Sequence, residues 1–309
     1  MVLDESTAAD TTDTTDMSVC AFKVTFECAS ALRTLADVLA NLLETVDIHV
    51  VKSADFEGIR VEAIDAKQVC LVVSQVQADV EMDCPHTVFC VNTKTFNTCV
   101  RHSQAHYSLS VESVVGSSSI RLMSFETLSN SSVTRFTLPT LVCEDEQSRF
   151  HDIEYKLFID METSELKSIV SMCLRLQGET LTFKVRQPKV EHDSNKRARS
   201  DRRHMVLTIS STGACQQEHT FYSYVEPHGD DCVVGKCDVV AATPNDEELE
   251  TTYEESYGAR VLGDFLRSID RHTVTLRLKK EKPLILHHKF GAVDSHVCLV
   301  VAPQVTDEQ

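Results

Sequence analysis

The chain has 309 residues, of which 30 are Lys or Arg and 47 are Asp or Glu, so its formal net charge is −17. Apolar residues make up 42% and charged residues 25%, a balance that is typical of globular proteins and excludes wholesale disorder. The length predicts two domains. The negative charge excludes a surface that coats DNA over its whole extent, although it is compatible with a local basic site.

The sequence also indicates the protein's setting. No apolar run approaches the ~20 residues that a membrane-spanning helix requires, and the N-terminus lacks the layout of a signal peptide, so we expect no membrane partner. Residues 1–17 carry five acidic residues and no Lys or Arg, which predicts a disordered acidic tail. The 12 cysteines are scattered through apolar runs, which indicates free thiols in an intracellular protein.

Period-2 alternation of apolar residues predicts short antiparallel strands along most of the chain, and only four segments have a helical period. The four predicted helices cover 29–46, 92–103, 163–177 and 257–271. Each half of the chain, 18–138 and 154–309, therefore runs strand, long helix, several strands, short helix and several strands. This order predicts an α+β protein of two similar domains, with a connector at 139–153. Two polar stretches, 187–204 and 226–250, lack both periods and are predicted to be loop insertions.

The polar faces of the predicted helices are rich in cations although the chain is acidic. The basic residues concerned, with one His beside them, are Arg33, Lys94, Arg101, His102, Lys167, Arg175, Arg260, Arg267 and Arg271. In the last three helices the cations recur at spacings that place them on one side. One interpretation is that the helices present cations to a phosphate backbone without reading bases. The alternative is that any surface helix presents Lys and Arg to water.

The C-terminal sequence LVVAPQVTDE, residues 299–308, resembles the end of proliferating cell nuclear antigen (PCNA), a family of sliding clamps. Further similarities to the family's helices and strands occur at Ser30–Leu35, Ile64–Leu71, Val91–Asn92, Thr163–Arg175 and Arg260–Arg267. The resemblance covers about residues 20–308. It implies a homotrimeric ring of six similar domains, with antiparallel sheets on the outside and four helices of each chain inside, around a bore that encloses double-stranded DNA.

On this resemblance the protein is a processivity factor for DNA polymerase and a docking platform for replication and repair proteins. The implied partners are DNA polymerase, a clamp loader, other proteins with clamp-binding peptides, and further copies of the chain. The implied location is the nucleus, or a viral replication compartment. Two alternatives stay open: a subunit of a heterotrimeric checkpoint-type clamp, and a clamp-fold scaffold that does not encircle DNA.

The resemblance also implies roles for particular residues. The family's bore cations match Arg33, Arg101, Arg175, Arg260 and Arg267. Three family lysines are replaced by Thr34, Ala40 and Thr98, and we expect Lys94, Lys167 and Arg271 to compensate for them. The family's hydrophobic pocket for partner peptides matches Ile64, Gln68, Val69, Leu71, Phe150, Pro283, Val300, Ala302 and Pro303. Val300 replaces an aromatic residue of the pocket wall, so a different peptide preference is expected.

Ring closure in the family pairs an edge strand of one domain with an edge strand of the neighbouring chain. The matching residues on the two edges are Phe136, Leu138, Cys215, Thr220 and Tyr222. The alternative is that both segments are plain outer edge strands, which natural proteins avoid leaving bare.

Other chemistry is not expected from the sequence. Five possible zinc ligands form an incomplete set: Cys215, His219, His228, Cys232 and Cys237. His287 and His288 are neighbours on a predicted strand and therefore point to opposite faces, so no metal or other cofactor is expected. No nucleotide-binding glycine loop or nucleophile motif is present, so we expect no enzyme. The basic run 195–203 is compatible with a nuclear localisation signal, an additional DNA or protein contact, or a solvated loop.

Overall fold

The structure is a computed structural model of the chain. It describes residues 21–114, 118–125, 133–143, 153–188, 203–228, 232–237, 249–269, 273–291 and 295–304. The acidic tail 1–17, most of the connector with Phe150, the basic run 195–203 except for Arg203, and Arg271 lie outside these described residues. No helix in the described part of the chain is long and apolar enough to cross a membrane.

Both halves of the chain contain the same series of elements. The first half contains β1 (Phe22–Phe26), α1 (Ser30–Leu42), β2 (Thr45–Lys52), β3 (Glu57–Ile64), β4 (Cys70–Gln77), β5 (Asp79–Met82), β6 (His86–Asn92), α2 (Thr93–His102), β7 (Ser108–Ser113), β8 (Ser119–Phe125) and β9 (Val133–Pro139). The second half contains β10 (Leu157–Glu162), α3 (Thr163–Arg175), β11 (Thr180–Pro188), β12 (Arg203–Thr212), β13 (Gln216–His228), β14 (Cys232–Cys237), β15 (Leu249–Gly258), α4 (Ala259–Ser268), β16 (Thr273–Leu278), β17 (Leu284–Lys289) and β18 (His296–Val301).

The strand order repeats as well. In the first half the orders are β5-β1-β7-β8-β9 and β6-β2-β3-β4, and in the second half they are β14-β10-β16-β17-β18 and β15-β11-β12-β13. Each strand of one half therefore has a counterpart nine strands later in the other. The predicted two-fold repeat of a mostly antiparallel α+β unit is confirmed.

The two halves are joined head to tail through their sheets. Strand β18 pairs antiparallel with β4, from His296 opposite Gln75 to Val301 opposite Cys70, which produces one sheet of 13 strands. The counterparts of these two strands, β9 and β13, have no such partner among the described residues. Strand β9 ends the five-stranded sheet, and residues 216–222 of β13 pair only with β12.

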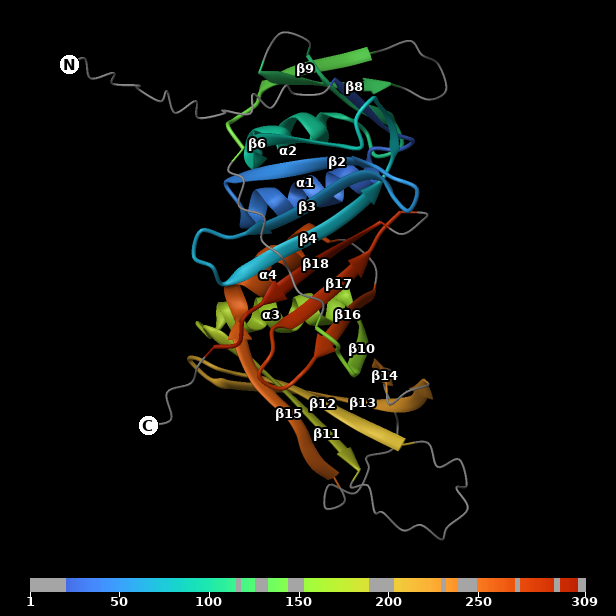
Figure 1. Cartoon of the computed structure of the whole chain (residues 1–309). Helices are drawn as coiled ribbons and strands as arrows, with labels where there is room; N and C mark the ends of the chain where they lie inside the picture. Colours follow the sequence, from blue (N-terminus) through green and yellow to red (C-terminus); the bar gives the residue numbers. More distant parts are fainter. Residues whose placement is uncertain are drawn as a thin grey trace, which may run out of the picture.

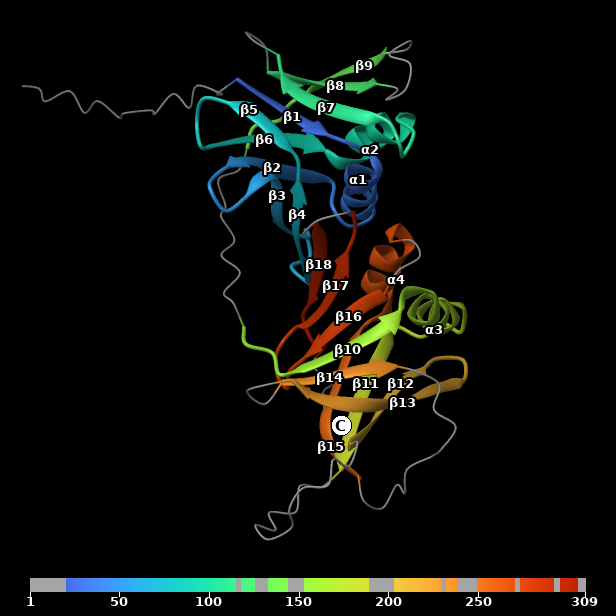
Figure 2. The same cartoon turned by 90° about the vertical axis from the view of Figure 1, so that its right-hand side faces the viewer.

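The four helices form a row on one side of the sheets, in the spatial order α2, α1, α4, α3 (Figures 1 and 2). Apolar residues at helical spacing, such as Leu32, Leu35 and Leu39 of α1, face the sheets and are fully buried. Burial of each such side chain stabilises the fold by about 1.5–3 kcal/mol. Across the junction of the halves, Asn41 Nδ2 donates to Ser268 Oγ at 2.7 Å.

The structure corrects several element boundaries. The first predicted helix extends to residue 46, but α1 ends at Leu42 and Val46 belongs to β2, because buried residues of that strand continue the helical period by coincidence. The predicted loop 226–250 is wrong for 232–237, which form β14, and for its two ends, which extend β13 and β15. Likewise β11 extends to Pro188, inside the other predicted loop, and β12 begins at Arg203.

Candidate functional site

The helical side of the molecule is positively charged. Helices α1 to α4 together carry seven Lys or Arg and three Asp or Glu, a net charge of +4 in a chain whose total is −17. Five of the predicted cations on this side are exposed: Lys94, Arg101, Arg175, Arg260 and Arg267. The helices lie together on one side of the sheets in Figure 2. Because their buried apolar residues face the sheets, we infer that these exposed cations lie on the side away from the sheets.

Part of this charge is compensated by neighbouring groups. The Nε atom of Arg101 lies 2.6 Å from Asp37 Oδ1, so an ion pair links α2 to α1. Within α4, Arg267 Nη2 lies 3.1 Å from Asp264 Oδ1. Lys167 Nζ donates to the backbone oxygen of Ile269 at 3.0 Å. The cations available to a polyanion are therefore fewer than the sequence suggests.

The remaining helical cations are placed differently. Arg33, Lys94, Arg175 and Arg260 make no ion pair with any described residue, and Arg33 is half-buried while the other three are exposed. His102 is exposed, and its ring packs against Phe136 of β9 at a centroid distance of 5.3 Å. Arg33, Lys94, Arg175 and Arg260 are thus the strongest candidates for contact with phosphates.

Removal of Asp37 should increase the affinity for duplex DNA. In Asp37→Asn the Arg101 guanidinium loses its charged partner, so one more cation can displace counterions from DNA. We expect the log–log salt slope of non-specific DNA binding to steepen by about one. The measurement is fluorescence anisotropy with a short duplex over a salt series. Glu81→Gln is the control, because it breaks the exposed pair with Lys23 on β1, away from the helices. An unchanged slope in Asp37→Asn would contradict DNA contact on this face.

The opposite face of the joined sheet carries a row of apolar residues across four strands. Ile64 of β3 faces Leu71 of β4, Leu71 faces Val300 of β18, and Val300 faces Ile285 of β17. Ile285 and Val300 are buried together with Tyr155, whose hydroxyl donates to the backbone oxygen of Pro283 at 2.7 Å. Ile64 is 48% exposed.

The turn between β3 and β4 completes this row. The carboxylate of Asp65 accepts hydrogen bonds from the backbone nitrogens of Val69 and Cys70 at 2.7 and 2.8 Å, which fixes the turn. Gln68 has a φ of 56° there, and the nitrogen of Ala302 donates to Val69 O at 3.1 Å. The structure therefore brings together the predicted pocket residues Ile64, Gln68, Val69, Leu71, Pro283, Val300, Ala302 and Pro303, whereas Phe150 is not described.

A groove of roughly 730 Å³ runs beside this row, over β3, β4, β16, β17 and β18. Of the predicted pocket residues that the structure describes, Val300 lines it. Its other apolar lining includes Val73 and Ile285, and its charged lining includes Arg60 and Arg277. Because Lys289, Asp55 and Glu57 also line it, the groove connects the apolar row to a part of the same face that carries charges of both signs.

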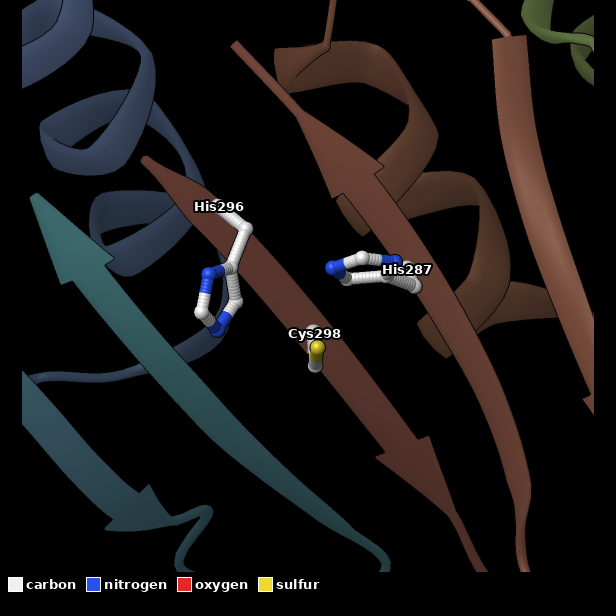
Figure 3. Close-up of side chains that lie close together, drawn as sticks. All are labelled: His287, His296 and Cys298. Atoms are coloured by element: carbon white, nitrogen blue, oxygen red, sulfur yellow. The ribbon is translucent and has the colours of Figure 1, made fainter. Parts of the chain in front are cut away.

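Three side chains with metal-binding atoms meet in this groove: His287, His296 and Cys298 (Figure 3). His287 lies opposite Cys298 in the β17–β18 pair, and His296 precedes Cys298 by two residues, on the same face. Their ligand atoms all lie within 4.8 Å of one another. This cluster is not predicted from the sequence, because it depends on the pairing register of two strands. The signal was an H-x-C pattern on a strand that follows a histidine-bearing strand.

The environment determines the protonation of these groups. Burial, followed by the charge of Arg277, lowers the pKa of His287 to about 3, so its imidazole is neutral at pH 7. Burial raises the pKa of the Cys298 thiol to about 11. As expected from strand geometry, His288 points to the other face, where it is buried.

The predicted subunit edges are only partly suitable for contact between chains. Leu138 was expected at the interface, but it is 3% exposed within its own chain and packs in the core. Cys215 lies in the turn before β13, not on the strand. Thr220 is exposed on β13 and Phe136 is half-buried on β9, while the side chain of Tyr222 is not described.

The position of Leu138 leads to a stability prediction. Leu138→Ala should lower the free energy of unfolding by about 2–5 kcal/mol, the usual cost of removing a buried Leu side chain, without changing the number of chains in the native particle. Urea unfolding and native mass together measure this. If the variant kept its stability but lost subunit association, the core placement would be wrong and the interface expectation right.

The two repeated α+β units, joined head to tail with their helices on one face, define a clamp fold. The crystal structure of proliferating cellular nuclear antigen from Entamoeba histolytica has this fold. It matches with a TM-score of 0.66 over 93% of this chain and 100% of that chain, at 16% sequence identity. No family model and no curated protein matches the sequence. The structural match shows that the chain has a PCNA-like clamp fold. The roles of its sites are inferred from this chain's own residues.

Proposed function

We propose that the protein is a sliding clamp, a ring of three chains that encircles duplex DNA and tethers a DNA polymerase and other replication and repair proteins to it. The junction of β18 with β4 carries this proposal. If the counterparts β9 and β13 pair between chains in the same way, every junction of the ring is equivalent. A head-to-tail contact of this kind closes into a ring when the rotation permits.

The free part of β13 supports this pairing. In β4 the residues that pair with β18 are the first six of the strand, 70–75. In β13 the corresponding first residues, 216–222, pair with β12 and have no partner on their other side among the described residues, whereas β14 covers that side from residue 223 onward. An unpaired edge of this length is a template for another strand.

The helical face supports the DNA part of the proposal. In such a ring the helices line the hole, and the cations on α1 to α4 meet the phosphates while the acidic remainder of the chain repels DNA from the outside. Contacts to phosphates carry no sequence information, so the ring can move along the duplex. No catalysis is proposed, and we assign the protein to the nucleus or to a viral replication compartment.

The test is topological. The protein is threaded onto a linear duplex that is anchored to a bead at one end, and the free end is then blocked with a bound protein. Because high salt screens phosphate contacts, retention at high salt reports encirclement, and a restriction cut should release the protein. We expect this result together with a native mass of three chains. A monomer would favour a heterotrimeric clamp, and a trimer that washes off would favour a scaffold.

A further inference from the structure

The cluster of His287, His296 and Cys298 in the groove has a composition that the clamp function does not require. Two imidazoles and one thiol come from two strands in the middle of the sheet, so their backbones are held in register on both sides. The centroids of His287 and His296 are 5.2 Å apart, with the rings edge to face. Among the described residues it is the one group of three such ligands with atoms this close.

We propose that His287, His296 and Cys298 bind a borderline-soft divalent metal ion of the Zn²⁺ type, with a fourth position open to the groove. His nitrogen and Cys sulfur are the ligands that zinc prefers. Around a tetrahedral zinc, bond lengths of about 2.0–2.3 Å place two nitrogens and one sulfur roughly 3.3–3.6 Å apart. Ligand atoms that lie within 4.8 Å of one another reach this arrangement by small side-chain rotations.

The groove supplies the fourth ligand. The three side chains line it and are only half-buried, so water has access to an ion held between them. Gln75 lies opposite His296 in β4 and also lines the groove, which places an amide where it can hydrogen-bond a metal-bound water. Three protein ligands and one water form an open site rather than a closed structural one.

Arg277 opposes metal binding and therefore provides a specific test. Its Nη2 atom lies 3.3 Å from His287 Nδ1, an arrangement in which Nδ1 accepts the hydrogen bond and the proton is on Nε2. When a metal takes Nε2, the proton moves to Nδ1, which can no longer accept from Arg277. Arg277→Gln removes the positive charge and supplies an oxygen that accepts from Nδ1, so it should tighten binding about tenfold or more.

The experiment uses the full chain, stripped of metal under reducing conditions and titrated with Co²⁺. We expect one equivalent to bind, with tetrahedral d–d bands and a near-ultraviolet band from thiolate to cobalt, and Zn²⁺ to displace it. Cys298→Ser should abolish the thiolate band, and His287→Asn or His296→Asn should weaken binding at least about tenfold. Native mass and thermal melting establish that each variant is folded.

Two controls make the result specific. His49 forms a histidine pair elsewhere in the molecule, with its Nδ1 2.9 Å from His86 Nε2. The variant His49→Asn should therefore leave the cobalt titration unchanged. The double variant Cys232→Ser/Cys237→Ser removes the closely spaced cysteine pair that the sequence offers as possible ligands, and it should also leave the titration unchanged. The proposal is overturned if no stoichiometric cobalt band forms, if the band survives Cys298→Ser, or if it is lost in the double variant. Affinity that is unchanged in Arg277→Gln would overturn the ligand geometry.

Discussion

If three chains form the proposed ring through β9, Thr137→Pro should dissociate it into folded monomers. The backbone nitrogen of Thr140 donates to Ser118 O at 2.9 Å, and the β8–β9 register has no shift, so alternate residues of β9 donate to β8. Thr137 lies an odd number of residues from Thr140, so its N–H points to the other side of β9, away from β8. On that side β9 has no partner strand among the described residues. Proline removes that donor and places its ring in the path of a neighbouring strand, while the β8–β9 ladder keeps its bonds.

The expected measurement is a native mass of one chain for Thr137→Pro, with loss of retention on end-blocked DNA and unchanged circular dichroism. Thr137→Val is the matched control, because it keeps the N–H and the shape of the side chain and should remain a trimer. Arg135→Pro repeats the experiment two residues away, where the N–H has the same direction, in case the first variant does not fold. Trimers in both proline variants would exclude β9 from the ring junction.

The order of elements could be predicted because it depends on local patterns. Strand and helix periods are properties of short windows, so all four helices were found, and α2 and α3 within two residues of their ends. The boundary errors have the same origin. The apolar pattern of α1 runs on into β2, and the polar, acidic composition around β14 gives no alternation to detect.

A functional site could be predicted from the sequence only where its residues lie in one continuous segment of the chain. Cations on a helix face follow from spacing, but the ion pair of Arg101 with Asp37 depends on how α2 packs on α1. The burial of Leu138 likewise depends on packing between elements. The metal ligands depend on a register between two strands, which a hairpin of unknown loop geometry does not reveal.

If the apolar row is the docking site for partner peptides, Ile64→Asp should weaken that docking without destabilising the chain. Ile64 is a large apolar residue at the exposed end of the row that continues through Leu71 to Val300, so it adds little to the core. An apolar peptide anchor that covers it must desolvate it, and a buried unpaired carboxylate opposes this strongly. We expect a loss of at least about tenfold in affinity, equivalent to about 1.4 kcal/mol, for a peptide with aromatic anchors.

The control for this variant separates docking from the other functions of the ring. Leu174→Asp introduces the same charge at an apolar side chain that is 37% exposed, but on α3, on the opposite side of the sheet. It should leave peptide affinity unchanged and weaken the affinity for duplex DNA at low salt, because it adds a negative charge to the helical face. Ile64→Asp should weaken peptide affinity and leave DNA binding unchanged, and its native mass should remain that of three chains. If both variants lost peptide affinity equally, the loss would reflect general destabilisation. If Ile64→Asp bound the peptide normally, the docking site would lie elsewhere on the chain.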